Sequence, residues 1–288
     1  MVIPCYNEEE NIRKIINQLV IVQNNVQKKH EFNLDMMIIN DGSSDKTKEI
    51  LEECHSLCKY EVINLERNRG YGHVLKTGFK HAKDNCYNWV ITFDMDGQHE
   101  PTCLYRFISR ILDPNNTAKI ISGSRYLNVN LFWENPWRDR FLVNTVVTGV
   151  FRTVGLPITD AFCGMKAHDV DVMNDLNIQL EGYDVAIEML TKINNEEIEL
   201  VEMAVPLIYM SRDDVLTKEK SESFLFRKGE ERIERYIQII HDMSSIKPKA
   251  SLEDCKRIFT NYFEKIDVVQ KEKFKEIQES IFSEISNL

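Results

Sequence analysis

Two carboxylates and an amide side chain are concentrated in the stretch Asp94-Met95-Asp96-Gly97-Gln98. A hard divalent cation prefers oxygen ligands, and Mg²⁺ usually takes one or two protein carboxylates together with substrate phosphates. The alternative is a solvated, acid-rich turn, because Asp-x-Asp by itself is a common pattern. The stretch therefore predicts a Mg²⁺ or Mn²⁺ site held by Asp94, Asp96 and Gln98. The segments around it favour this metal site over a solvated turn.

A short apolar run, residues 89–93, comes directly before these acids and is rich in β-branched and aromatic residues. Such a run favours a buried strand. The acids then lie at the C-terminal end of that strand, where open α/β sheets bind ligands. Asp41 has the same placement after the predicted strand 36–39, although a turn or cap role is equally compatible with it.

Strand and helix patterns alternate through the first 126 residues. Strands are predicted at 1–3, 36–39, 60–65, 89–93 and 119–122, and helical periodicity between them at 12–20, 50–51, 75–82 and 104–112. This alternation predicts an α/β fold with a mostly parallel, Rossmann-like sheet flanked by helices.

The pattern changes after Tyr126. A long loop, 127–140, carries aromatic residues beside Arg138 and Arg140. Aromatic rings with arginines suit a ligand that has an apolar part and an anionic part, but they also suit packing under a loop. Helices are predicted at 141–154 and 182–193, with residues 160–167 between them and Asp160 as a further acidic candidate. A last strand, 198–209, is interrupted by Pro206, which favours a sheet edge or a strand end.

The C-terminal part is charged and has helical periodicity. Residues 211–222 predict a mobile polar loop, 224–243 a helix, and 251–288 one or two amphipathic helices that pack on the body or on a second copy. We therefore expect a catalytic domain at 1–223 and a C-terminal helical extension at 224–288, through which a homo-oligomer could form.

Composition excludes several classes of function. The net charge of −10 argues against nucleic acid as the main partner. No apolar run reaches the roughly 18 residues of a membrane span, and no signal peptide is evident. The 7 scattered cysteines show no zinc pattern, so reduced thiols are expected. These features predict a soluble, cytoplasmic protein, with contact to the cytoplasmic face of a membrane as a compatible option.

Five motifs occur in a specific order: VIPCYNEEENI, IINDGSSDKT, ERNRGYGHVLKTGFKHA, DMDGQHEP and SGSRY. In this order and spacing they resemble the family 2 glycosyltransferases with the GT-A fold, and most of all the dolichyl- or polyprenyl-phosphate sugar transferases. DAFCGMKA is similar to the Asp-x-x-Ser/Cys-Gly-Phe segment of those enzymes. The resemblance extends over residues 1–218.

The resemblance implies roles for residues that match the family motifs. Those implied to bind the nucleotide part of a donor are Pro4, Tyr6, Glu8 and Asp41. The acidic stretch, with Met95 between its two carboxylates, is implied to bind the metal and the diphosphate. Arg125 matches an arginine near the sugar and the acceptor phosphate, and Arg212 and Lys218 match a pair that contacts phosphates.

Several positions depart from the family pattern. Asn40 replaces the first acid of Asp-Asp-Gly, and Met165 replaces the usual Phe. The loop after Arg212 lacks the family's Gly-x-Ser before Lys218, and the chain beyond residue 224 is outside the shared pattern. No membrane anchor accompanies the motifs.

The implied activity is an inverting, metal-dependent hexosyl transfer from a GDP- or UDP-sugar to a polyprenyl or dolichyl phosphate. The alternative acceptor is a glycan hydroxyl, which needs a carboxylate base. The predicted catalytic residues are Asp96, Arg125 and, as that base, Asp160. Two other classes of protein are alternatives to a glycosyltransferase. A nucleotidyltransferase would carry a basic, Gly-rich loop after its first strand, and a non-catalytic scaffold would not retain Asp-x-Asp-x-Gln.

Overall fold

The computed structural model describes residues 1–29, 33–55, 59–209 and 229–288. They form two compact units. The first unit comprises Met1–Ser122 and Gly164–Gly182, and the second comprises Gly123–Cys163 and Tyr183–Leu288. The predicted boundary between residues 223 and 224 lies outside the described residues, and this domain division stays a prediction.

The first unit contains a sheet with the strand order β3-β2-β1-β4-β6-β5. Strand β1 pairs in parallel with β2 and β4, and β2 pairs in parallel with β3. The predicted fold class, a mostly parallel α/β sheet flanked by helices, is confirmed. The strands are β1 (Val2–Cys5), β2 (Met37–Asn40), β3 (Glu61–Asn64), β4 (Trp89–Thr92), β5 (Ile120–Ser124) and β6 (Lys166–Asp169).

Strand β6 is the element that the sequence did not indicate. It pairs antiparallel with β4 on one side and with β5 on the other. Residues 160–167 lie between the helices Arg138–Thr153 and Val170–Asp175, as expected, but no strand was predicted at their end. The strand contains Lys166 and His168, both buried, where an alternating or apolar pattern would be expected. Pairing with two neighbouring strands, rather than local propensity, fixes its conformation.

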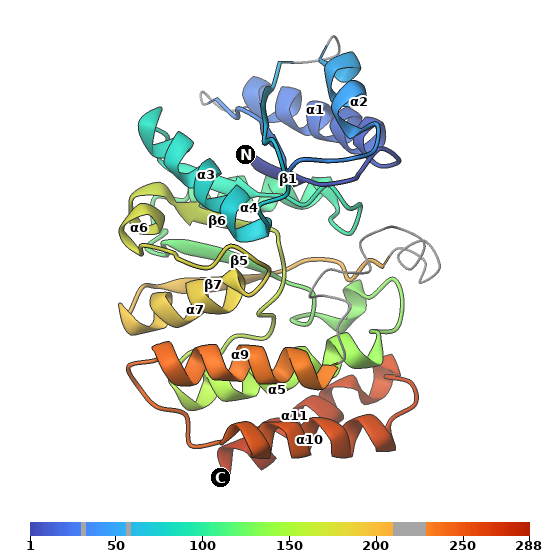
Figure 1. Ribbon diagram of the computed structural model, residues 1–288, viewed down its shortest axis with the longest axis vertical. Helices are drawn as coiled ribbons and strands as arrows, with labels where there is room; N and C mark the ends of the chain where they lie inside the picture. Colours follow the sequence, from blue (N-terminus) through green and yellow to red (C-terminus); the bar gives the residue numbers. More distant parts are fainter. Residues whose placement is uncertain (30–32, 56–58, 210–228) are drawn as a thin grey trace. The chain divides into compact units, whose positions relative to one another are not determined.

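Five helices belong to the first unit: α1 (Ile12–Lys29), α2 (Thr47–Cys54), α3 (Tyr71–Asp84), α4 (Leu104–Ile111) and α6 (Val170–Asp175). Their apolar faces follow the predicted period. In α1, for example, Ile12, Ile15 and Leu19 are each at most 2% exposed. Helix α1 packs against α2, and α3 packs against α6 (Figure 1).

The second unit is built around one helix that is buried on all sides. Every residue of α5 (Arg138–Thr153) from Phe141 to Phe151 is buried. Such a helix needs cover on all its faces. The covering helices are α9 (Gly229–Met243), α10 (Leu252–Lys265) and α11 (Phe274–Ser286), which pack on α5, and α7 (Val185–Asn195), which packs on α9 (Figure 1).

The C-terminal helices therefore pack on their own chain, which was one of the two predicted alternatives; the other was packing on a second copy. Gly149 of α5 permits this packing, since a Cβ there would lie 2.6 Å from Cδ1 of Ile285. Helix α10 begins with a capping box between Ser251 and Asp254. Packing on a second copy stays a prediction.

Strand β7 (Leu200–Ala204) is the last strand in the sheet order and ends before Pro206. The predicted strand end at Pro206 is therefore confirmed. Among the residues that the structure describes, no helix is both long enough and apolar enough to span a bilayer.

Candidate active site

The carboxyl ends of β1, β2 and β4 point to one edge of the first unit's sheet, because these strands are parallel. The residues that follow them supply the predicted donor-binding side chains. Gly97 turns the chain after β4 with a φ of 76°, a conformation that favours glycine. The Asp96 carboxylate accepts hydrogen bonds from the backbone N of Gln98 at 2.9 Å and from Nε2 of Gln98 at 2.9 Å. Asp96 and Gln98 are thus held next to each other, as a shared metal site requires.

Asp94 lies in a more enclosed environment than Asp96. Its Oδ1 accepts a hydrogen bond from the Tyr71 hydroxyl at 3.0 Å, and its Oδ2 lies 3.2 Å from Nε2 of His99. Burial raises the pKa of Asp94, but the hydrogen bonds from His99 and Tyr71 and the charge of Lys166 outweigh it and lower the pKa. The carboxylate is therefore kept ionised by its surroundings.

Gly164 is required beside this carboxylate. A Cβ at position 164 would lie 1.8 Å from Oδ2 of Asp94, closer than any real contact. The carbonyl of Gly164 also accepts a hydrogen bond from the Thr92 hydroxyl at 2.6 Å. The glycine of the DAFCGMKA segment thus lets β6 approach the end of β4 closely.

The Asp41 carboxylate organises the glycine-containing loop that precedes α3. It accepts hydrogen bonds from the backbone N of Arg69 at 2.7 Å and of Gly70 at 2.8 Å. Asp41 is buried, and its own backbone N donates to the Cys5 carbonyl at the end of β1. The structure therefore gives Asp41 a loop-holding role, while its predicted donor contact stays a prediction.

The turns after β1 and β2 are tied together. Asn7, with a φ of 52°, accepts a hydrogen bond from the backbone N of Ser44 at 2.9 Å. The backbone N of Glu8 donates to the Thr47 hydroxyl at 2.9 Å, and the buried Glu8 carboxylate accepts from Asn11 at 2.7 Å. These bonds fix the stretch that contains Pro4, Tyr6 and Glu8 and are compatible with its predicted nucleotide contacts.

Asn40, the departure from Asp-Asp-Gly, works as a local cap. Its Oδ1 accepts hydrogen bonds from the backbone N of Ser43 at 3.1 Å and from the Ser43 hydroxyl at 2.6 Å. Its Nδ2 donates to Oδ1 of Asn64 at 2.9 Å, which joins the ends of β2 and β3. An amide can make both kinds of bond at once, whereas an ionised Asp could only accept.

The second unit contains a buried ion pair. The Arg125 guanidinium donates to both oxygens of Asp160, from Nε at 2.7 Å and from Nη2 at 2.9 Å. The Asp160 side chain is fully buried and that of Arg125 is 12% exposed. Burial lowers the pKa of Arg125, but the charge and hydrogen bonds of Asp160 outweigh it and raise the pKa well above its usual value. The geometry gives Asp160 the role of holding Arg125, which is a different role from that of a free general base.

Glu202 supports this ion pair, and the sequence analysis did not identify it. Its carboxylate accepts hydrogen bonds from the backbone N of Thr159 at 2.9 Å, the Thr159 hydroxyl at 2.8 Å and the backbone N of Asp160 at 3.0 Å. Asn144 of α5 holds the other side of the same turn through Thr159 and Ala161. Burial raises the pKa of Glu202, against the effect of these hydrogen bonds.

The two arginines of the aromatic loop have different environments. Nη1 of Arg138 donates to the carbonyls of Phe263 at 3.2 Å and Ile266 at 3.0 Å, at the C-terminal end of α10. That is a typical structural position for a cation. The Arg140 guanidinium instead lies 4.7 Å from the centre of the Trp137 ring, which stacks on Tyr209 at 4.6 Å. The Arg138 guanidinium also lies 3.7 Å from the centre of the Phe263 ring, so both arginines have the aromatic setting predicted for a ligand contact.

Arg212 and Lys218, the predicted phosphate-binding pair, lie outside the described residues. Two residues that contact Asp94, Tyr71 and His99, were absent from our predicted set. His99 follows Asp94 by five positions within DMDGQHEP, so its place in that motif is the signal that could have found it.

The donor atoms at the end of β4 fit a hard divalent cation. Within residues 1–29, 33–55, 59–209 and 229–288, no group of three or more His, Cys, Asp and Glu side chains could hold a metal ion. Two Asp carboxylates and a Gln amide match the sparse ligand set that Mg²⁺ takes when substrate phosphates complete its coordination. Asp96 and Gln98 would hold such an ion, with the ionised Asp94 close by in the sequence.

The comparison with known proteins shows the family of the chain. Residues 1–175 match the family described as glycosyl transferase family 2. The chain belongs to this family, and the predicted enzyme class is confirmed.

Characterised relatives are similar over most of their length. A UDP-N-acetylglucosamine–dolichyl-phosphate N-acetylglucosaminyltransferase from Methanococcus voltae is 28% identical over 224 residues, 73% of this chain and 85% of that protein. A polyprenol monophosphomannose synthase from Mycolicibacterium smegmatis is 26% identical over 219 residues, 74% of this chain and 77% of that protein. Both names include a polyprenyl-type lipid, as the sequence motifs implied.

Solved structures share the fold. Glucosyl-3-phosphoglycerate synthase from Mycobacterium tuberculosis, in complex with Mn²⁺, UDP and phosphoglyceric acid, superposes with a TM-score of 0.55. The alignment covers 86% of this chain and 79% of that one, at 15% sequence identity. At this identity the likeness concerns the fold alone.

Proposed function

We propose that this glycosyltransferase moves a sugar from a UDP- or GDP-sugar to a polyprenyl or dolichyl phosphate. The observation that carries the proposal is the pairing of Asp96 with Gln98 at the end of β4, next to an Asp94 that its neighbours keep ionised. The relatives named above, whose names state dolichyl-phosphate and polyprenol, support the acceptor class.

The donor is bound by the first unit in this proposal. The fixed turn containing Tyr6 and Glu8 contacts the nucleoside, and Asp96 and Gln98 are the residues that would hold Mg²⁺ or Mn²⁺. The ion supplies Lewis-acid stabilisation of the negative charge that develops on the leaving diphosphate. Tyr71 and His99 keep Asp94 oriented and ionised, so the site does not reorganise as that charge appears. Arg212 and Lys218 stay predicted contacts of the diphosphate.

The acceptor is bound by the second unit. A phosphate oxygen is already ionised near neutral pH, so it can attack the anomeric carbon without a general base, and attack opposite the leaving group inverts that centre. Arg125, held in one orientation by Asp160, pairs with the acceptor phosphate. A glycan hydroxyl would need a base. The observed commitment of both Asp160 oxygens to Arg125 makes that alternative the weaker one. A lipid acceptor puts the reaction at the cytoplasmic face of a membrane.

The test is the release of nucleoside diphosphate from a panel of UDP- and GDP-sugars. Each donor is incubated with Mg²⁺ or Mn²⁺, with and without a short-chain polyprenyl phosphate. We expect one donor to be consumed, only when both a divalent ion and the lipid phosphate are present. A folded protein that releases no diphosphate from any donor would contradict the proposal. Consumption that requires a glycan in place of the lipid would support the alternative acceptor.

A further inference from the structure

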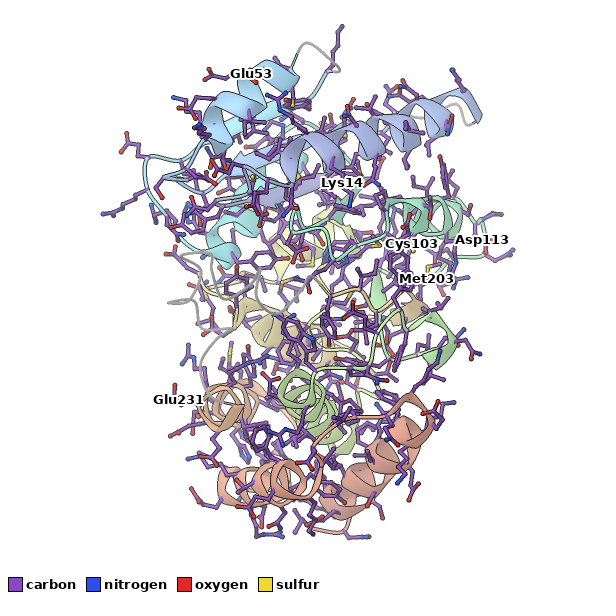
Figure 2. All side chains as sticks on the ribbon, turned by 90° about the vertical axis from the view of Figure 1, so that its right-hand side faces the viewer. Lys14, Glu53, Cys103, Asp113, Met203 and Glu231 are labelled. Atoms are coloured by element: carbon purple, nitrogen blue, oxygen red, sulfur yellow. The ribbon has the colours of Figure 1, made fainter. Side chains whose placement is uncertain are left out.

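Arg232 of α9 is buried although it is an arginine. The residue is 3% exposed, and its Nε and Nη1 atoms have no hydrogen-bond partner among the described residues. The residues just before it, Glu230 and Glu231, are exposed, and Figure 2 labels Glu231 in the first turn of α9. Buried polar groups in native proteins are almost always hydrogen-bonded, so these two nitrogens indicate a missing partner.

Aromatic rings line this guanidinium. Its central carbon lies 5.9 Å from the centre of the Phe162 ring and 6.0 Å from that of Tyr236, and the two rings contact each other at 4.8 Å. Burial raises the pKa of Tyr236, while the charge of Arg232 lowers it. The rings exclude water without supplying a counter-charge, which makes an unmatched cation costly here.

Positive charge accumulates around this position. Burial lowers the pKa of Arg140, and the charges of Arg125 and Arg232 lower it further, although Tyr209 opposes them. Arg125 and Arg232 are therefore each near enough to Arg140 for their positive charges to act on it. Asp160 is bound to Arg125, and within the described residues Arg232 forms no ion pair with any carboxylate. A bound anion would offset these positive charges and satisfy Arg232.

We propose that Arg232 binds the phosphate group of the acceptor together with Arg125 and Arg140. A phosphomonoester fits because it carries up to two negative charges and several acceptor oxygens, which match the fork of a guanidinium. All three arginines belong to the second unit. Arg232 lies beyond residues 1–175, so a residue of the C-terminal helices becomes part of the substrate site. The identification of the anion as the acceptor's phosphate rests on the proposed function.

The first experiment needs no turnover. Melting temperatures of the full chain are measured in inorganic phosphate and in chloride at matched ionic strength, since a ligand that binds only the folded state raises the melting temperature. The variants are Arg232→Gln, Arg232→Lys and the control Arg235→Gln, which removes an arginine of the same helix that pairs with Asp184 and is 45% exposed. We expect phosphate to stabilise the wild type and Arg235→Gln, to stabilise Arg232→Lys partly, and to leave Arg232→Gln unaffected.

The second experiment measures transfer. For Arg232→Gln we expect the KM for a short-chain isoprenyl monophosphate to rise about 10- to 100-fold, the range that loss of a charged hydrogen bond produces, with the donor KM unchanged. Glycerol phosphate is the soluble comparison, and we expect the isoprenyl phosphate to be the better acceptor. A preference for glycerol phosphate with the same dependence on Arg232 would support the phosphate site with a soluble source.

The outcomes separate this inference from the proposed function. If no donor is consumed but phosphate still distinguishes Arg232→Gln from Arg235→Gln, the anion site stands and the proposed function fails. If transfer proceeds and Arg232→Gln behaves as Arg235→Gln does in both experiments, this inference fails alone. Failure of phosphate to stabilise the folded wild type beyond chloride also overturns it. Because Arg232→Lys keeps the charge, the comparison remains decisive if the glutamine variant folds poorly.

Discussion

The two units handle buried charge in opposite ways. In the first unit the functional side chains are acids, and hydroxyl, imidazole and backbone N–H donors hold them, as with Asp94 and Asp41. In the second unit they are arginines, held by the Asp160 carboxylate or enclosed by aromatic rings. The contrast fits the proposed function, in which acids hold a divalent cation and arginines pair with an anionic acceptor.

The largest effect is expected from removing the acid that pairs with Gln98. Asp96→Asn should lower kcat/KM by roughly 10³-fold and abolish stimulation by Mn²⁺, because an amide cannot neutralise a divalent ion. Asp84→Asn is the matched control, since Asp84 is exposed and, among the residues that the structure describes, its ion pair is with Lys80 at the surface. Full activity of folded Asp96→Asn without a divalent ion would contradict the proposal that acids of the first unit hold a metal ion.

Breaking the buried ion pair tests the second unit. Asp160→Asn should cost about 3–5 kcal/mol of unfolding free energy, because it leaves the Arg125 guanidinium buried without a counter-charge. Urea unfolding measures this loss, and the double variant Arg125→Met with Asp160→Leu should recover part of it. In transfer assays the KM of the acceptor should rise. A loss confined to kcat, with the acceptor KM unchanged, would instead make Asp160 a general base.

His168 of the first unit tests how that unit treats a buried basic side chain. It is buried, and the charged residue that acts on it is the cation Lys166. Burial, with a smaller effect from the Lys166 charge, lowers the pKa of His168 from 6.5 to about 3. The folded state therefore binds a proton less readily than the unfolded chain, so stability is lost as pH falls below 6.5 towards 3. His168→Phe should remove this loss, which is about 2 kcal/mol at pH 5. Urea unfolding at pH 8 and pH 5 measures it, and an equal pH dependence in both proteins would contradict the neutral histidine.

The smallest expected effect concerns the orientation of Asp94. Tyr71→Phe removes the hydroxyl that donates to Asp94 at 3.0 Å and should lower kcat/KM about 10-fold, the cost of roughly one hydrogen bond to a charged group. Tyr105→Phe is the control, since the Tyr105 hydroxyl accepts an exposed hydrogen bond from Asn25. Unchanged kinetics in Tyr71→Phe would show that Asp94 needs no orientation from this side.

Local pattern was sufficient for elements whose side chains match their surroundings. The apolar run before Asp94 predicted β4, and the periodicity of Ile12, Ile15 and Leu19 predicted α1. It failed for β6, where Lys166 and His168 occupy a strand paired on both sides. The backbone hydrogen bonds to two neighbouring strands favour the extended conformation more strongly than the residues' own propensities oppose it. Such a strand therefore cannot be predicted from local sequence.

The sequence by itself determined the class of chemistry, since DMDGQHEP and the motifs before it are contiguous stretches whose residue types and order indicate a sugar-nucleotide site. The tertiary structure decided which side chains form hydrogen bonds and ion pairs with one another. Asp160 lies 35 positions from Arg125, and Glu202 lies 42 positions beyond Asp160, so no spacing in the chain indicates their contact. The burial of Arg232 likewise depends on α9 packing against α5. Contacts between distant segments arise from the packing of whole elements, which local periodicity does not encode.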